Sequence, residues 1–313
     1  MSDPVRQIAD AVLYEGYVLW PYRRSALKNQ QRWTFGGVYP RAHSIEHPDD
    51  RWLMRTECLL EGEGAACDVA VRFLHVVRRD VAGPDGTLVD ALTVDGERHL
   101  AWDEAAEREL APGPIALPAG TQQEDLGQAG AIVRSWEALE GAIAVSSTRL
   151  APGLQRVSVE ITNTSRWAGG ERADALRRTF CSTHTVLRAT GGAFVSLTDP
   201  PEHLREHAEA CRNEGTWPVL VGEPGRRDTL LSSPIILEDH PRIAPESPGD
   251  LFDGGEIDQM LVLNILSLTD EERAEMRDSD PRTREILERT EALTPEELMR
   301  LHGAIREFQA VRG

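Results

Sequence analysis

Residues 68–77 read Asp-Val-Ala-Val-Arg-Phe-Leu-His-Val-Val, and β-branched and apolar side chains dominate this run. Such a composition favours extended backbone. The tetrapeptide Gly-Pro-Asp-Gly follows at 83–86, and these are the residues that turns prefer. The run therefore predicts a β-strand that ends in a turn.

Further extended runs lie on both sides of this strand. Residues 92–100 predict a hairpin around Asp95-Gly96, because this dipeptide suits a tight two-residue turn. Two more pairs are expected to be 142–148 with 157–163, and 179–189 with 193–197. Short strands without long helices between them indicate antiparallel sheets, as in a sandwich or an open barrel.

Helical patterns are confined to a few places. Apolar spacing predicts a short helix over 5–13, another is expected near 103–110, and a longer one over 199–213. Two strands should follow at 217–237, and Thr269-Asp-Glu-Glu is a strong helix start near the C-terminus.

The fold class predicted from these patterns is α+β, with an antiparallel β-rich body, sandwich or open-barrel-like, and a helical C-terminal part. Four regions are expected along the chain. They are an aromatic and basic segment (1–44), the β-rich domain (45–237), a loop rich in Pro, Gly and acids (238–258), and the helical region (259–313).

The charge balance excludes several classes of protein. The 313 residues include 34 Lys and Arg against 52 Asp and Glu, a net charge of −18. General nucleic-acid binders usually carry a basic footprint, so we do not expect one here. No apolar run is long enough to span a bilayer, and the N-terminus lacks the order of a signal peptide. Four cysteines are too few for a disulfide scaffold, so a cytoplasmic protein is expected.

Common catalytic motifs are absent from the sequence. There is no phosphate-binding Gly-x-x-x-x-Gly-Lys loop, no Gly-x-Ser-x-Gly elbow, no Cys-x-x-Cys and no His-Glu-x-x-His. The only lysine, Lys28, leaves one candidate for Schiff-base chemistry. These absences do not exclude enzymes that lack a short motif.

One cluster has the ligand types of a transition-metal site. His203, His207 and Cys211 are spaced four apart, so a helix would place them on one stripe. Cys181 and His184 could approach from the preceding strand. Imidazole and thiolate suit Ni or Zn. The alternative is an amphipathic helix with Cys211 in its apolar side and half-exposed histidines.

The loop that ends near residue 258 offers two further possibilities. Asp239 and His240 could form an acid–imidazole pair for proton transfer, and Glu246 is a further candidate in the loop. A hard cation could bind to carboxylates near the end of the loop, which are Asp250, Asp253, Glu256 and Asp258. The alternative is a rigid connector, stiffened by its prolines. Such an ordered loop could also serve as a binding surface.

The aromatic and basic opening is the strongest candidate for partner binding. Its residues Trp20, Arg23, Arg24, Arg32 and Trp33 are of the types that carry binding energy at protein interfaces. The alternative is that they pack onto the β-rich domain with their arginine stems covering the rings.

Two stretches carry a family resemblance. Residues 14–23 with 28–33, and residues 232–258 running into 265–272, resemble an uncharacterised bacterial family associated with gene clusters of uptake [NiFe] hydrogenases. The resemblance implies an accessory or assembly role around a nickel-iron enzyme. It supplies no activity and no catalytic residues.

The function expected from the sequence is a cytoplasmic accessory protein that binds a protein partner, and the resemblance implies a role in hydrogenase maturation or assembly. The alternative is a metal-dependent enzyme on a β-rich scaffold. Enzymatic activity is the less favoured of the two.

Overall fold

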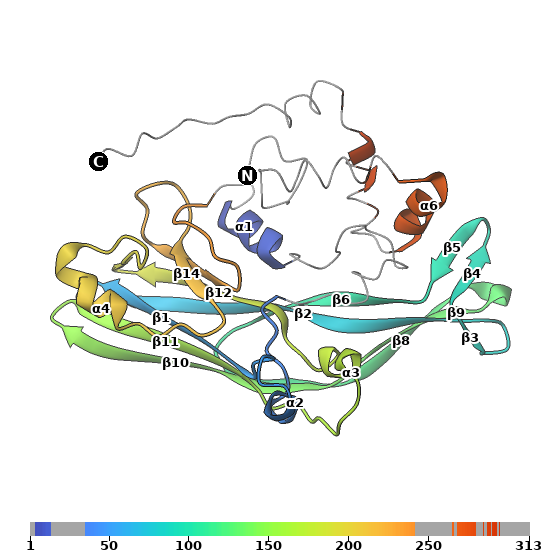
Figure 1. Ribbon diagram of the computed structural model, residues 1–313, viewed down its shortest axis with the longest axis horizontal. Coiled ribbons are helices and arrows are strands. Elements are labelled where there is room, and N and C mark those ends of the chain that lie inside the picture. The colour runs from blue at the N-terminus through green and yellow to red at the C-terminus, as the bar shows by residue number, and fades with distance from the viewer. Residues whose placement is uncertain are drawn as a thin grey trace.

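Two antiparallel sheets form the body of the molecule (Figure 1). The computed structural model describes residues 4–13, 35–241, 265, 268–279, 284, 287, 288, 290–292 and 294. The predicted antiparallel, β-rich body is confirmed.

The larger sheet has eight strands and is organised around β2 (Ala66–Ala82). One edge of β2 pairs with β12 and then with β9, and the other edge pairs with β6 and then with β3. The remaining strands of this sheet are β15, β14 and β8. The bounds are β3 (Leu88–Val89), β6 (Trp102–Leu110), β8 (Gly120–Asp125), β9 (Ala131–Trp136), β12 (Cys181–Thr190), β14 (Trp217–Leu220) and β15 (Thr229–Ser233).

The smaller sheet has five strands in the order β13-β1-β11-β10-β7. Its centre is the predicted hairpin around Pro152-Gly153, and Gly153 takes the left-handed conformation (φ 68°). The bounds are β1 (Leu53–Glu61), β7 (Gly113–Leu117), β10 (Leu139–Ala151), β11 (Leu154–Asn163) and β13 (Ala193–Phe194). A separate hairpin, β4 (Ala91–Val94) with β5 (Glu97–Leu100), forms at Asp95-Gly96 as predicted.

The main core lies between the two sheets. Phe73 of β2 and Phe180, just before β12, meet there with ring centroids 4.8 Å apart, and both are fully buried. On the other side of β2, Leu74 and Val76 pack in a second cluster with Leu176. Because both faces of β2 are covered, its sequence is a nearly continuous apolar run rather than an alternating one.

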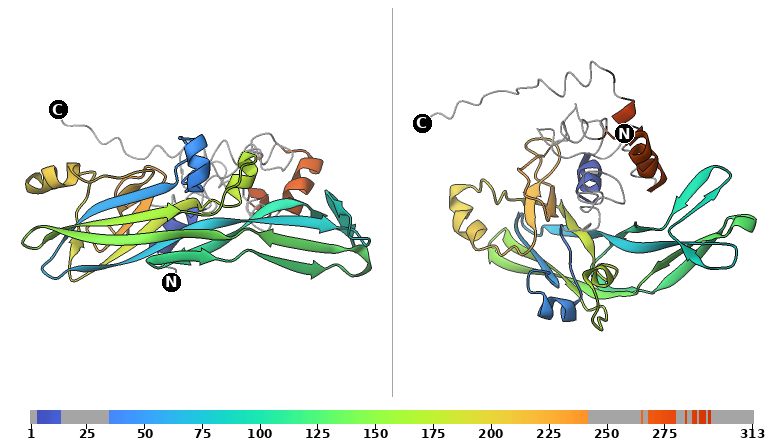
Figure 2. Two further views of the ribbon diagram at one scale, coloured as in Figure 1. Left: turned by 90° about the horizontal axis from the view of Figure 1, so that it is seen from below. Right: turned by 45° about the vertical axis from the view of Figure 1, so that its right-hand side comes forward.

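Helices cover parts of both sheets (Figures 1 and 2). The predicted N-terminal helix is confirmed as α1, whose Ile8 and Ala9 pack on Val186 of β12. The C-terminal α6 begins after Thr269, whose hydroxyl and backbone exchange hydrogen bonds with Glu272, so that predicted helix start is also confirmed. The bounds are α1 (Pro4–Leu13), α2 (Arg41–Glu46), η2 (Gly127–Ala129), α3 (Arg172–Leu176), η3 (Glu202–Leu204), α4 (Arg205–Glu209) and α6 (Asp270–Ser279).

Two local predictions are wrong. Residues 103–110 form most of strand β6 rather than a helix, since the whole segment pairs with β2. Residues 193–197 were expected to pair with the strand before them, but β13 pairs with β1 in the other sheet. Gly192 permits this crossing, because a Cβ there would lie 2.3 Å from the carbonyl oxygen of Glu61.

Candidate partner-binding surface

The chain passes from one sheet to the other at residues 211–217. Arg55 of β1 and Glu214 exchange two backbone hydrogen bonds, of 3.1 and 2.8 Å. Trp217 then begins β14, the edge strand of the eight-stranded sheet. This crossing closes one side of the body.

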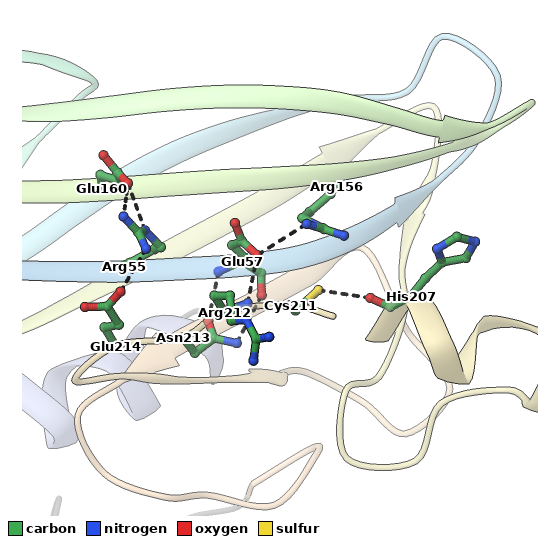
Figure 3. A network of polar contacts seen from close by, with 9 residues as sticks. All are labelled: Arg55, Glu57, Arg156, Glu160, His207, Cys211, Arg212, Asn213 and Glu214. Carbon is green, nitrogen blue, oxygen red and sulfur yellow. Dashed lines mark hydrogen bonds and ion pairs between the residues drawn. The ribbon is translucent and has the colours of Figure 1, made fainter. Parts of the chain in front are cut away.

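Charged side chains hold the crossing segment on the five-stranded sheet (Figure 3). The Arg55 guanidinium donates to Glu160 on β11 and to Glu214, at 2.8 Å each. The hydrogen bond with Glu160 is the main cause that raises the pKa of Arg55. The backbone N–H of Arg212 donates to the Glu57 carboxylate (2.7 Å). The Glu57 N–H donates to the side chain of Asn213 (2.8 Å).

A buried chain of hydroxyl groups braces the same corner from inside. Thr56 Oγ1 of β1 donates to Ser232 Oγ of β15 at 2.8 Å. Ser232 Oγ also shares a hydrogen bond of 2.7 Å with Thr216 Oγ1. All three side chains are buried, so these bonds join both sheets to the crossing segment where water does not compete.

Replacing Ser232 with alanine is expected to lower the free energy of unfolding by about 1–3 kcal/mol, because two buried hydroxyls would lose a partner. Denaturant titration measures this change. The exposed Thr121 of β8 provides the control, since Thr121→Ala should stay within about 0.5 kcal/mol of wild type. Equal effects of the two substitutions would show that the hydroxyl chain does not stabilise the corner.

Three residues with exposed apolar side chains are backbone neighbours of Pro234, in the chain or across a strand pair or close packing contact. Gly36 packs against the Pro234 ring, and Phe35 precedes it in the chain. Trp217 pairs in register with Ser233, and Ile236 follows two residues after Pro234. The exposed fractions are 42% for Phe35, 44% for Trp217 and 72% for Ile236. We call these three side chains, with Pro234, the Pro234 patch.

The predicted metal cluster is not assembled. The helix expected over 199–213 is wrong in its extent, because η3 and α4 end at Glu209 and leave Cys211 outside the helix. The helix ends early because of a tertiary contact, since Glu57 forms hydrogen bonds with Arg212 and Asn213, the two residues after Cys211. The Cys211 thiol contacts the backbone carbonyl of His207 at 3.6 Å, while the His207 imidazole points away (Figure 3). Burial raises the pKa of Cys211 to about 11, which disfavours the thiolate that a metal would need.

The other proposed ligands are not gathered near Cys211, and two of them are enclosed in the interior. Cys181 belongs to the buried cluster with Leu74, and His184 is fully buried with Nδ1 3.1 Å from the Ser182 carbonyl oxygen. His203 is exposed on η3. In the part of the chain that the structure describes, no three His, Cys, Asp or Glu side chains are arranged to hold a metal ion.

Asp239 and His240 do not contact each other as an acid–imidazole pair. The Asp239 carboxylate accepts hydrogen bonds from Ser196 Oγ and from the backbone N–H of Leu220 (2.8 Å). The His240 Nδ1 lies 3.2 Å from the Gly222 carbonyl oxygen. Both residues therefore fasten the chain beyond β15 to the end of β14 and the residues just after it. The loop carboxylates Glu246, Asp250, Asp253, Glu256 and Asp258 lie outside the described residues.

The residues predicted to bind a partner also lie outside the described residues. These are Trp20, Arg23, Arg24, Arg32 and Trp33. Phe35 belongs to the same aromatic opening, and it is the member that the structure places in the Pro234 patch. Trp217 carried no signal in the sequence, because only strand pairing with Ser233 brings its backbone next to Pro234, and nothing in the sequence links Ile236 to Phe35.

One polar cluster was missed at the sequence level. His43 Nε2 lies 3.0 Å from Asp50, and Arg172 reaches both Asp50 (3.6 Å) and the Tyr39 hydroxyl. The His43 ring meets Trp167 edge-on, with centroids 5.3 Å apart. Because His43 is 1% exposed, this set fixes α2 and α3 to the body and has no open reaction space.

No protein-family model and no curated protein matches the sequence. Among the described helices, none combines the length and the apolar character needed to cross a membrane. The geometry of the Pro234 patch is therefore the main guide to function.

Proposed function

We propose that this protein is an accessory protein that binds a protein partner through the Pro234 patch. The observation that carries the proposal is the exposure of Phe35, Trp217 and Ile236 around one proline. Aromatic side chains contribute most of the binding energy at many protein interfaces. An exposed apolar cluster on a braced support loses little conformational entropy on binding.

The network under the patch supports this proposal. Trp217 directly follows the segment that Arg55 and Glu57 hold, and its strand neighbour Ser233 lies next to the buried Ser232. An exposed side chain without a binding role does not require a hydrogen-bonded network beneath its backbone. The rigid corner instead presents the indole in a fixed position, which is the arrangement of a preorganised binding site.

The partner class rests on the resemblance to proteins of uptake [NiFe]-hydrogenase gene clusters. We propose that the partner is a hydrogenase polypeptide during maturation or assembly. The net charge of −18 favours a partner with a basic surface, since opposite charges accelerate the encounter.

Affinity purification of the tagged protein from cells that produce an uptake [NiFe] hydrogenase tests the partner class. A hydrogenase subunit or maturation protein should be enriched over the same cells with an untagged chain. Recovery of partners that have no relation to hydrogenase, under conditions where the enzyme is made, would contradict this part of the proposal.

Replacing Trp217 with alanine is expected to weaken binding to the purified partner by about 2 kcal/mol or more, roughly 30-fold, because the indole is the largest side chain of the patch. Folding stability should change little, since almost half of the side chain is exposed. The matched control is Leu88→Ala, which removes an exposed aliphatic side chain beside the C-terminal end of β2. Equal affinities of the Trp217→Ala and wild-type proteins would exclude the patch as the docking site.

A further inference from the structure

Most free strand edges of the two main sheets are protected against pairing with another chain. The β6 edge carries charges from Asp103 to Glu109, and β8 ends in two acids. The edge strands β7 and β14 contain Pro114 and Pro218, and proline cannot donate a hydrogen bond to an added strand. The edge strands β3 and β13 have two residues each. Natural sheets use these devices to prevent edge-to-edge association.

The β10 strand is the exception. One edge pairs with β11 along its length, whereas the other edge pairs with β7 only from Leu139 to Ile143. Residues 144–148, Ala-Val-Ser-Ser-Thr, have no second strand partner among the described residues, and all five are exposed. They carry no charge and no proline, and they contain the β-branched residues that strands prefer.

The core is also incomplete beside this edge. Val145 faces the same side as Ile143, which is buried in the main core, and it pairs in register with the buried Val159. Val145 is nevertheless 39% exposed. A further strand on this edge would cover Val145 and extend the sheet that already contains Val159.

We propose that a second copy of this chain occupies the edge, with residues 144–148 of the two copies pairing antiparallel across a two-fold axis near Ser146. The inference goes beyond partner binding at the Pro234 patch and does not depend on it. Two chains of charge −18 repel each other, so a contact between them requires an uncharged strip, and residues 141–148 carry no charge. Antiparallel self-pairing about Ser146 would place the two Ser146 hydroxyls opposite each other, a favourable cross-strand pair, and Ser147 of one copy opposite Val145 of the other.

Sedimentation equilibrium of the full-length protein tests this proposal, at concentrations up to about 100 μM, because small interfaces dissociate in the micromolar range. The wild-type protein should reach twice the mass of one chain. Val145→Lys should remain monomeric, since an inward-pointing lysine blocks an edge. Ile45→Lys is the matched control, because Ile45 is 74% exposed on α2, and this variant should dimerise as wild type does. A monomeric wild-type protein, or a dimeric Val145→Lys variant, would overturn the proposal.

Disulfide trapping gives an independent readout. The Cα atoms of facing residues in an antiparallel pair lie about 4.5–5.5 Å apart, which is within the Cα–Cα range that a disulfide spans. Ser146→Cys should therefore form a covalent dimer under mild oxidation. Ser158→Cys is the control, because Ser158 pairs with Ser146 but has a strand on each side. Equal dimer yields from the two variants would also overturn the proposal.

Discussion

Acidification from pH 7 to about pH 4.5 is expected to destabilise the fold through two buried histidines. Burial lowers the pKa of both His75 and His184 to about 4, and the nearby cations Arg108 and Arg72 act in the same direction. Unfolding would restore a pKa near the ordinary value of 6.5. The unfolded chain therefore binds protons that the folded chain excludes.

The sign of the pH dependence follows from this difference. The stabilisation that comes from keeping these histidines neutral is fully present above about pH 6.5. The free energy of unfolding then falls as the pH drops from there toward 4. Below pH 4 both states are protonated and the slope vanishes. Between pH 7 and pH 4.5, each histidine is expected to lower the free energy of unfolding by about 2–3 kcal/mol, because each unit of pKa shift corresponds to about 1.4 kcal/mol.

Replacing His184 with asparagine separates this effect from the titration of surface carboxylates. The amide nitrogen of asparagine can donate to the Ser182 carbonyl in place of Nδ1, but it does not titrate in this range. The variant should lose about 2–3 kcal/mol less than wild type between pH 7 and pH 4.5, measured by denaturant titration at each pH. His203→Asn, at an exposed position, should follow the wild-type curve. Parallel curves for wild type and His184→Asn would contradict this prediction.

Replacing Phe180 with alanine is expected to cost about 3–5 kcal/mol of folding stability. The ring is fully buried, its centroid lies 4.8 Å from that of Phe73, and it belongs to the cluster that joins the two sheets. Its backbone also pairs with Val38, so the surrounding structure is held on both sides and cannot collapse into the cavity. Thermal and denaturant unfolding measure the loss.

Phe35 provides the matched control for this substitution. Phe35→Ala removes the same ring from an exposed position of the Pro234 patch, and folding stability should stay within about 0.5 kcal/mol of wild type. If Phe35→Ala destabilised the fold as strongly as Phe180→Ala, the Phe35 ring would belong to the core and not to a binding surface.

The sequence predicted those parts of the fold that depend on neighbouring residues. The hairpins at Asp95-Gly96 and Pro152-Gly153 form because the turn residues and both strands lie close in the chain. The start of α6 at Thr269 is equally local, since the capping hydrogen bonds span three residues. These features need no knowledge of the rest of the molecule.

Long-range pairing decided the elements that the sequence did not predict. The segment that forms β6 is rich in Glu and Ala, which favour helix, but pairing with β2 along nine residues outweighs that preference. The helix near Cys211 stops early because Glu57, more than 150 residues away, binds the chain that follows. The Pro234 patch has the same origin, because it joins three positions that are distant in the sequence.

Hydrogen–deuterium exchange of the protein, alone and with a partner recovered by affinity purification, tests the central claim most directly. The account predicts slower exchange in the partner's presence at residues 35–38, 215–218 and 233–237, which surround the Pro234 patch. The Ser146 edge should be unchanged at a fixed protein concentration. Slower exchange confined to other parts of the chain, with no change at these three segments, would contradict the claim that the partner binds here.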